Sequence, residues 1–364
     1  MSTKKVKIGI IGCGGIANGK HMPSLSKLDN VEMVAFCDII EERAVQAAKQ
    51  YGCADAKVYT DYTELLKDAS IEVVHVLTPN SSHSPISVAA MKADKHVMCE
   101  KPMAKSYAEA QVMLKTAKET GKKLTIGYQG RFRPDSLYLK KACEAGDLGE
   151  IYYARAQAVR RRAVPTWGVF LDEEKQGGGP LIDIGTHALD LTLWMMDNYE
   201  PASVTGSVYR KLADTENAAN AWGPWDPKKF TVEDSAFGMI KMKNGATIWL
   251  EASWALNTLL VDEAKTILCG TKAGADMMGE NDSLRINGER FSKTYTQEVD
   301  SNAGGVAFYD GASASPADVE AKMWIDHVLD DSKPLLTKPE QAIVVTQLLE
   351  AIYESAKTGK TITF

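Results

Sequence analysis

Short apolar runs alternate with amphipathic stretches through residues 1–128. The runs predict buried β-strands at Val6–Ile11, Val31–Cys37, Val73–Leu77, His96–Cys99 and Leu124–Tyr128. The stretches between them predict helices near Ala17–Leu28, Glu41–Tyr51, Tyr62–Lys67, Pro85–Ala93 and Ser106–Thr120. Gly121, directly after the last helix, is a typical stop signal. Nearly continuous apolar strands separated by helices indicate a parallel sheet covered on both faces, so we expect a doubly wound α/β domain of the Rossmann type.

The pattern changes after Arg133-Pro134, where strands begin to follow one another directly. Strands are predicted at Ile151–Arg161, Ala202–Leu212, Asp234–Met242, Ala246–Trp254 and Ala264–Leu268. Asn244-Gly245 between two of them is a strong signal for a tight hairpin. Strands without intervening helices indicate a mainly antiparallel sheet, so residues 129–315 are expected to form an α+β domain.

Helices complete this second part of the chain. They are predicted near Asp135–Ala145, Gly185–Met196, Ala317–Leu329 and Pro339–Thr358. Ala213–Lys229, rich in Ala, Asn, Pro and Trp, predicts a long loop. We therefore expect three segments: a dinucleotide-binding domain over 1–128, an α+β domain over 129–315, and C-terminal helices over 316–364 that pack back on the core.

Composition narrows the class of protein. The 364 residues carry 42 Lys and Arg against 48 Asp and Glu, and 45% are hydrophobic, which is an ordinary globular balance. The net charge of −6 makes nucleic acid a poor partner. The apolar stretch Val6–Ile11 is too short for a secretory core, and no run is long enough to cross a membrane. Six cysteines without paired spacing fit reduced thiols, so we expect a cytoplasmic protein.

A glycine-rich turn follows the first predicted strand and opens the first predicted helix. It fits G-x-G-x-x-A, and its candidate cofactor-binding residues are Gly12, Gly14, Gly15, Ile16 and Ala17. Asp38 ends the second strand, where a carboxylate would bind the adenosine ribose hydroxyls and repel a 2′-phosphate. NAD is therefore favoured over NADP. The alternatives are a glycine turn that binds nothing and an Asp38 that only caps the helix before Glu41.

Three segments leave the first sheet at its carboxyl edge, where open α/β sheets bind ligands. They are Thr78-Pro79-Asn80, Glu100-Lys101-Pro102 and Gln129–Arg133. Lys101 closely follows an apolar strand and precedes a proline, so its ammonium is expected to lie over the cofactor and stabilise a developing alkoxide. A solvated surface lysine is the alternative.

The run from Gly177 to Asp190 places Asp183 and His187 four residues apart, on one face if this stretch is helical. His187 is the candidate base, because imidazole exchanges protons near neutral pH. Asp190, three residues further, is a candidate to orient it. The alternatives are a core histidine capped by Asp183, and a metal site, which lacks a further Cys or His cluster.

These motifs together resemble the glucose–fructose oxidoreductase, inositol dehydrogenase and rhizopine-catabolism (Gfo/Idh/MocA) family of NAD(P)-dependent oxidoreductases. The resemblance rests on the glycine loop, on Glu100-Lys101-Pro102 and on the Gly177–Asp190 run, and it extends over the whole chain. It implies a Rossmann domain followed by an open antiparallel sheet whose free face makes homo-oligomer contacts. One departure is Gln129-Gly130, where many members carry an asparagine ahead of the position of Arg131.

The resemblance also implies roles for single residues. Lys101, Asp183 and His187 match the family's catalytic set, and Lys101-Pro102 matches a cis peptide. Asn80, His83 and Glu100 would border the nicotinamide ribose, with Thr78 also at the cofactor.

The expected reaction is the reversible oxidation of a secondary ring hydroxyl of a sugar, glycoside or cyclic polyol. His187 takes the hydroxyl proton, Lys101 stabilises the oxygen, and Asp183 positions both. The candidate substrate contacts are Arg131, Arg160, Arg162 and Trp167, although a basic strand edge and simple packing are the alternatives for the last three. A glycoside, possibly oxidised at position 3, is favoured over inositol. An NAD-retaining redox-cycle glycosidase and a non-catalytic sugar sensor are the competing functions.

Overall fold

The computed structural model describes residues 5–278, 283–299 and 315–364. The chain divides into two compact units, one of Met1–Phe132 with Ser313–Ile343, the other of Arg133–Ala312 with Val344–Phe364. The C-terminal segment from residue 316 is therefore shared between the two units. Each unit has a sheet of its own.

The first unit contains a six-stranded sheet in the order β3-β2-β1-β4-β5-β6, with every neighbouring pair parallel. The strands are β1 (Val6–Ile11), β2 (Val31–Cys37), β3 (Lys57–Tyr59), β4 (Val73–Val76), β5 (His96–Cys99) and β6 (Leu124–Ile126). The strand order reverses between β1 and β4, which is where such sheets bind ligands. The predicted doubly wound α/β domain is confirmed.

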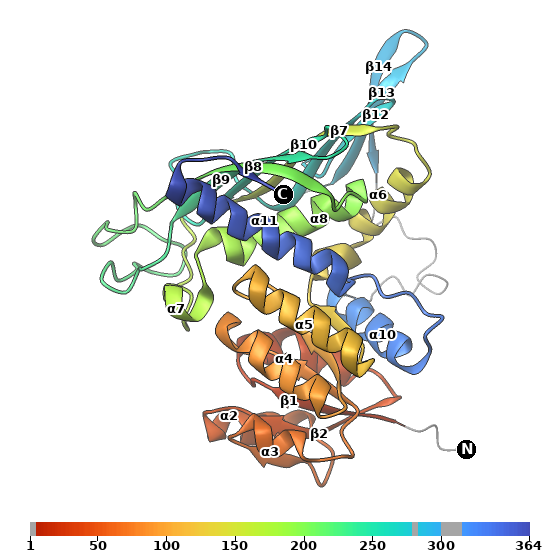
Figure 1. The fold of residues 1–364 in the computed structure, drawn as a ribbon, viewed down its shortest axis with the longest axis vertical. Helices are drawn as coiled ribbons and strands as arrows, with labels where there is room; N and C mark the ends of the chain where they lie inside the picture. Colours follow the sequence, from red (N-terminus) through yellow and green to blue (C-terminus); the bar gives the residue numbers. More distant parts are fainter. Residues whose placement is uncertain (1–4, 279–282, 300–314) are drawn as a thin grey trace. The chain divides into compact units, whose positions relative to one another are not determined.

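Helices cover this sheet (Figure 1). They include α2 (Glu41–Tyr51), α3 (Tyr62–Leu66), α4 (His83–Lys92), α5 (Tyr107–Thr120) and α10 (Pro316–Leu329). The α5 helix ends at Gly121, which has a left-handed φ of 66°, so the predicted stop is confirmed.

Two expectations for this unit need correction. The helix predicted over Ala17–Leu28 ends at Leu25, and its first turn, Ala17–His21, is π-helical before α1 (Met22–Leu25). The edge strand β3 was not predicted, because three residues with an exposed lysine carry no apolar run. Within the described ranges, no helix has both the length and the apolar character needed to cross a bilayer.

The second unit contains a nine-stranded sheet in the order β14-β13-β12-β11-β7-β10-β9-β8-β15. The strands are β7 (Ile151–Val159), β8 (Pro201–Tyr209), β9 (Ser235–Met242), β10 (Thr247–Ser253), β11 (Asp262–Gly270), β12 (Ala273–Asp276), β13 (Leu284–Arg290), β14 (Lys293–Val299) and β15 (Ile362–Thr363). Only the β7–β10 pair is parallel, so the mainly antiparallel sheet is confirmed. Gly245, at φ 92°, turns the predicted β9–β10 hairpin.

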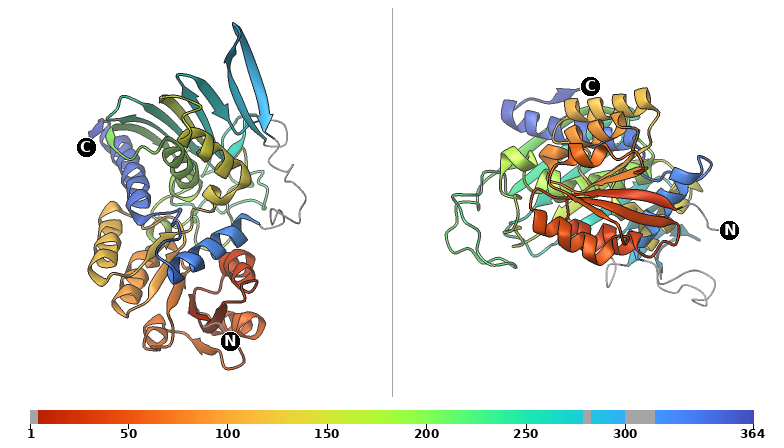
Figure 2. Two further views of the ribbon diagram at one scale, coloured as in Figure 1. Left: turned by 90° about the vertical axis from the view of Figure 1, so that its right-hand side faces the viewer. Right: turned by 90° about the horizontal axis from the view of Figure 1, so that it is seen from below.

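Helices pack on one face of this sheet (Figure 2). They are α8 (Thr186–Met196) and the part of α11 (Pro339–Thr358) that belongs to the unit, while α6 (Pro134–Glu144) packs against α8. The short α7 (Glu173–Gln176) lies in a connection. Gly238 lets α11 approach closely, since a Cβ there would lie 2.6 Å from Cδ1 of Ile352. The β13–β14 hairpin projects beyond its neighbours (Figure 1). Residues 213–229 contain no helix or strand, as predicted.

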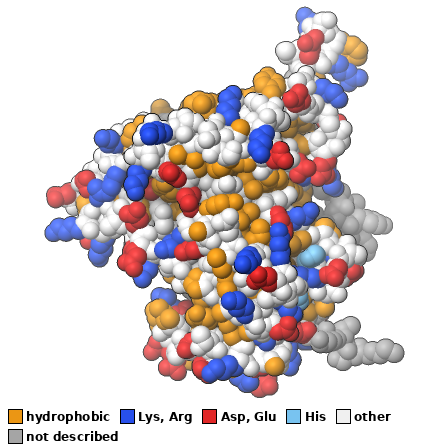
Figure 3. Space-filling view, in the orientation of Figure 1, with side chains coloured by type: hydrophobic (Ala, Val, Ile, Leu, Met, Phe, Trp, Pro, Cys, Tyr) orange, Lys and Arg blue, Asp and Glu red, His pale blue; other side chains and the backbone are white. Residues whose placement is uncertain are grey.

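The distribution of charged side chains and the state of the cysteines agree with the amino-acid composition. On the face that Figure 3 shows, basic and acidic side chains are interspersed. All six cysteines are free, and Cys13, Cys37 and Cys99 are buried. Burial, with Asp38 nearby, raises the pKa of the Cys13 and Cys37 thiols to about 12, so both remain neutral thiols at physiological pH.

Candidate active site

The glycine loop between β1 and the first helix lets other groups come close to its backbone. Gly12 has a φ of 92°, and a Cβ there would lie 2.4 Å from the Leu77 carbonyl oxygen, so only glycine fits. At Gly14 and Gly15 a Cβ would meet no atom within 4 Å. The space over the loop, at the start of a helix, suits a pyrophosphate. Ala17 is fully buried, which lets helix and sheet pack closely.

Asp38, at the end of β2, is tied to this loop. Its Oδ2 accepts the Cys13 backbone N–H at 2.9 Å, and its Oδ1 accepts the Ile40 N–H at 2.9 Å. The N-cap of α2 is Ile40, so Asp38 is not the N-cap of that helix. The carboxylate therefore lies at the glycine loop, as a ribose-binding acid must, and the loop and Asp38 together fit an NAD site.

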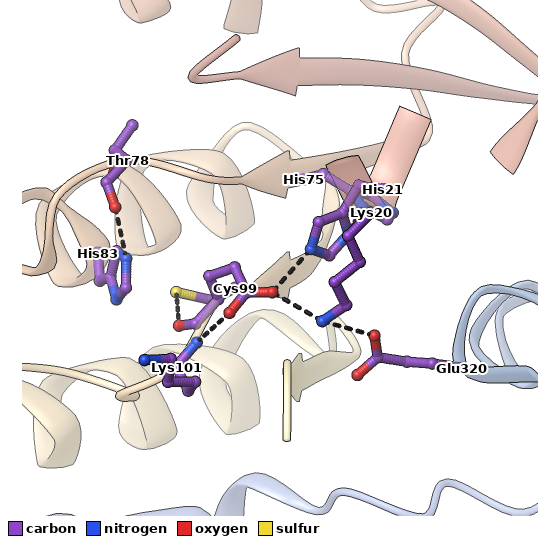
Figure 4. Close-up of polar contacts among 9 residues, drawn as sticks. Lys20, His21, His75, Thr78, His83, Cys99, Lys101 and Glu320 are labelled. Atoms are coloured by element: carbon purple, nitrogen blue, oxygen red, sulfur yellow. Dashed lines mark hydrogen bonds and ion pairs between the residues drawn. The ribbon is translucent and has the colours of Figure 1, made fainter. Parts of the chain in front are cut away.

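The other predicted cofactor residues gather at the carboxyl ends of β4 and β5. His83 opens α4 and places its Nδ1 2.7 Å from the Pro102 carbonyl oxygen. Its Nε2 lies 2.9 Å from the Thr78 carbonyl oxygen (Figure 4). Burial lowers the pKa of His83, which favours the neutral ring. The Lys101-Pro102 peptide is cis, as the resemblance implies. His83 thus links the segment at Thr78 to the segment at Lys101.

Glu100, the residue before Lys101, lies in a buried network of charges. Its Oε1 lies 2.7 Å from the Lys20 Nζ and 2.8 Å from the His21 Nε2, and its Oε2 accepts the Lys101 backbone N–H at 3.0 Å (Figure 4). Lys20 also pairs with Glu320 of α10 at 2.8 Å. The carboxylate therefore holds the backbone of the Lys101 segment within the first unit.

The charges in this network stabilise one another. Burial alone would raise the pKa of the Glu100 carboxyl, but Lys20 and His21 hold it well below its usual range. Burial alone would lower the pKa of Lys20, but Glu100 and Glu320 raise it. Glu100 and Lys20 are thus both ionised over the neutral range. The neighbouring His75 is kept neutral, since burial and then His21 lower its pKa well below the usual value.

In the second unit, Asp183 and His187 occupy one continuous helical stretch. A π-helical turn over Leu181–Gly185 leads directly into α8. Between residues 181 and 190 these two side chains alone are half-buried, and all the others are buried. The stretch is therefore helical, as the prediction required, and Asp183 and His187 lie on the same face of it. Asp183 Oδ2 accepts a hydrogen bond from the Trp254 indole at 3.1 Å, whereas Asp190 is 1% exposed and lies inside the unit.

Glu233 fixes the beginning of this helical stretch and was not predicted. Its carboxylate accepts the N–H groups of Gly179 at 2.8 Å and Leu181 at 3.1 Å, and the Tyr353 hydroxyl at 2.8 Å. Burial raises the pKa of Glu233 in spite of these donors. Because the three partners lie 52 to 120 residues away, no local motif in the sequence signals this role.

The predicted substrate arginines are engaged with protein groups. The strand predicted over Ile151–Arg161 ends at Val159, so Arg160 and Arg162 both lie beyond β7. Arg160 makes two hydrogen bonds to Glu263, at 2.6 and 2.5 Å, and Arg162 donates to the Asn257 Oδ1 at 2.6 Å. Both side chains therefore have protein partners in this structure.

Arg131 and Trp167 have opposite surroundings. Arg131 is 0% exposed, and its guanidinium donates to the Leu336 carbonyl oxygen at 2.7 Å and to the Gln341 side chain at 2.6 Å. It thereby holds the C-terminal segment of the first unit, and the expected substrate contact finds no support there. Trp167 is 51% exposed. Among the described residues, no group of three or more His, Cys, Asp and Glu side chains is arranged to hold a metal.

Comparison with known proteins agrees with this arrangement. Residues 6–128 match the sequence model described as "Oxidoreductase family, NAD-binding Rossmann fold", and residues 140–364 match "Oxidoreductase family, C-terminal alpha/beta domain". The first description confirms the NAD prediction.

Among similar proteins, D-glucoside 3-dehydrogenase of Escherichia coli (strain K12) is 36% identical over 360 residues, covering 99% of this chain and 97% of the relative. Glucose-6-phosphate 3-dehydrogenase of Bacillus subtilis (strain 168) is 33% identical over 65% of each chain. The structure of levoglucosan dehydrogenase in complex with NADH and levoglucosan superposes with a TM-score of 0.82, covering 99% of each chain at 21% identity, which establishes a common fold.

Proposed function

The chain belongs to the Gfo/Idh/MocA family of NAD-binding oxidoreductases, and from this premise we propose that it oxidises a secondary ring hydroxyl of a sugar or glycoside reversibly to a ketone. The observation that carries the proposal is the gathering, in one unit, of a dinucleotide loop and a lysine segment held by a buried carboxylate. The full-length similarity to a glucoside 3-dehydrogenase favours a glycoside oxidised at position 3 over a cyclic polyol.

The residues that hold NAD are proposed to be those of the glycine loop, Asp38, and the cluster at the carboxyl ends of β4 and β5. Gly14 and Gly15 leave space for the pyrophosphate, and Asp38 accepts hydrogen bonds from the adenosine ribose. Thr78, Asn80, His83 and Glu100 form the edge at which the nicotinamide end binds. When bound, NAD supplies the acceptor for the hydride of the oxidised carbon.

Lys101, Asp183 and His187 are proposed to act on the reacting hydroxyl. His187 accepts the hydroxyl proton as the C–H bond breaks, and the ammonium of Lys101 stabilises the negative charge that develops on the oxygen. Asp183, with one carboxylate oxygen fixed by Trp254, orients the hydroxyl toward His187. A homo-oligomer formed through the second sheet and a cytoplasmic location are part of the same proposal.

The test is an NADH-formation screen over inositols, aldoses, methyl glycosides and sugar acids, with NMR of the product from any active substrate. We expect NADH to form in proportion to a keto sugar. Sugar release without net NADH would identify the redox-cycle glycosidase instead. Tight NAD binding without turnover of any compound would identify the sensor.

A further inference from the structure

Two large aromatic side chains lie side by side on the surface of the second unit. Trp167 is 51% exposed and Trp222 is 45% exposed, and their ring centroids lie 4.8 Å apart in a T-shaped arrangement. They come from two separate loops, one before α7 and one within residues 213–229. Contiguous exposed apolar surface marks binding sites, whereas single exposed apolar residues are common on protein surfaces.

The two loops are held together by hydrogen bonds. Asn220 accepts the Val164 N–H at 2.8 Å, and its side-chain amide donates to the carbonyl oxygens of Val164 at 3.0 Å and Gly223 at 2.8 Å. Thr166, next to Trp167, donates to the Trp222 carbonyl oxygen at 3.0 Å. The two indoles are therefore positioned in advance of any ligand, which lowers the entropic cost of binding.

The Arg160 guanidinium packs against one of the two rings and is paired with a carboxylate. It lies 5.5 Å from the Trp222 ring centroid and makes two hydrogen bonds to Glu263. It thereby supports the Trp222 ring without presenting an unpaired positive charge. A surface of this kind suits a neutral ring and does not suit a phosphate group.

A series of contacts connects the pair to Asp183. Trp167 contacts Phe170 with ring centroids 5.9 Å apart, and Phe170 contacts Trp254 at 6.5 Å. The Trp254 indole donates to the Asp183 carboxylate at 3.1 Å. The exposed pair is thus two ring contacts away from the tryptophan that orients Asp183.

We propose that Trp167 and Trp222 bind the aglycone, which is the neutral group linked to the anomeric carbon of a glycoside, while the sugar ring is held at Asp183 and His187. The proposal rests on the proposed function and makes it more specific. Sugar and aryl rings stack on exposed indoles through their apolar faces. The preferred substrate is therefore a glycoside with a ring-shaped aglycone, and neither a free hexose nor a hexose phosphate.

The experiment compares kcat/KM for methyl and phenyl glucosides, with both anomers of each, by following NADH. Phenyl glucosides are expected to be preferred, and Trp167→Ala and Trp222→Ala are expected to lower kcat/KM for them by about three- to tenfold while methyl glucosides change less than about twofold. Trp167→Phe, which keeps an aromatic ring, is expected to restore much of the preference. Tyr138→Ala is the control, because Tyr138 is 44% exposed on α6 and lies outside both the pair and the sheet proposed for contacts between copies.

The outcomes separate this inference from the proposed function. If the unaltered protein oxidises neither glucoside nor any other sugar, the proposed function itself is wrong. If it oxidises both but the variants lower both equally, or lower neither, the aglycone site is wrong. A loss of oligomer mass in Trp222→Ala with an unchanged phenyl preference would assign the pair to contacts between copies of the chain and overturn the proposal.

Discussion

The Tyr353 hydroxyl donates a hydrogen bond to Oε1 of Glu233 at 2.8 Å, within the second unit. The same carboxylate receives the N–H groups of Gly179 and Leu181, where the helical stretch with Asp183 and His187 begins. A negative charge there satisfies N–H groups that have no partner inside the helix. The position of two proposed catalytic side chains therefore depends on a residue some fifty positions away in sequence.

Replacing this cap is expected to disturb the helix start. Glu233→Gln keeps the size of the side chain but loses its charge, and its amide NH₂ would point at N–H donors. A lost buried hydrogen bond to a charged group is worth about 1.5–3 kcal/mol, so this variant should lower Tm by several degrees. It should also lower kcat by more than it changes the NAD Kd. Tyr353→Phe removes one donor of the three and should have a smaller effect on both. An equal or larger effect of Tyr353→Phe would contradict the capping role.

The buried ion pair of Lys20 and Glu100 in the first unit leads to a prediction about how stability depends on pH. Lys20→Met leaves the carboxylates of Glu100 and Glu320 without their cation, which should cost about 3–5 kcal/mol in the free energy of unfolding at pH 7. Thermal or urea unfolding of the two proteins measures this difference.

The sign of the pH dependence follows from the pKa shifts. The pKa of Glu100 is lowered in the folded protein, so its contribution is present above its usual value of 4.5 and is lost in more acid solution. The pKa of Lys20 is raised, so its contribution is present below 10.5 and is lost in more alkaline solution. In Lys20→Met the Glu100 carboxyl loses the largest of the charges that lower its pKa while its burial remains, so the variant should gain stability from pH 7 to pH 5 relative to the parent. A constant difference across that range would contradict this account.

The glycine loop allows a matched comparison. Gly12→Ala forces a Cβ onto the Leu77 carbonyl oxygen at a positive φ and should lower Tm as well as NAD binding. Gly14→Ala meets no protein atom and should leave Tm unchanged, yet weaken NAD binding by about tenfold because the Cβ occupies the proposed phosphate space. Gly19→Ala, also in open space but outside the loop, is the control. Calorimetric NAD titration and Tm measure both effects, and normal NAD affinity in Gly14→Ala would exclude this loop as the phosphate site.

Asp38 sets the expected coenzyme preference. Asp38→Ser removes the negative charge that accepts from the Cys13 N–H and would face a 2′-phosphate. We expect the ratio of kcat/KM for NAD over NADP to fall by about tenfold or more, because one like-charge contact is lost and one ribose acceptor is weakened. Steady-state kinetics with each coenzyme measures the ratio. An unchanged ratio would mean that Asp38 serves only to hold the loop.

The sequence predicts the parts of the fold that carry strong local patterns. Buried parallel strands such as Val6–Ile11 and the Asn244-Gly245 hairpin are recognisable because burial or turn geometry is specified by neighbouring residues. The β13 and β14 strands were missed, since most of their residues are at least partly exposed and show no apolar alternation. The end of β7 at Val159 could not be predicted from the neighbouring sequence either, because Arg160 pairs with Glu263, which lies 103 residues away.

The residues of the candidate site also fall into those that a local motif predicts and those that only the tertiary structure reveals. The glycine loop, Asp38, Asp183 and His187 stand in motifs of fixed spacing. In the structure Asp38 bonds to the loop at Cys13, and Asp183 and His187 lie on one helical stretch. Glu233, Glu320 and Trp222 act through partners more than fifty residues away, so only tertiary structure reveals them. Arg131 shows the same limit, because its burial and its bonds to the Leu336 carbonyl oxygen and the Gln341 side chain, 205 and 210 residues away, have no signal in the local sequence.

We propose that Lys101 and His187 act on one hydroxyl group, and a double-mutant cycle on kcat, with NAD affinity measured in parallel, tests this directly. Lys101→Ala and His187→Ala are each expected to lower kcat by about a hundredfold or more. The double variant should lose much less than the product of the two effects, because both groups serve a single step. The NAD Kd should stay within about twofold throughout. Near-normal turnover in either single variant, or full multiplication of the two losses, would contradict the account.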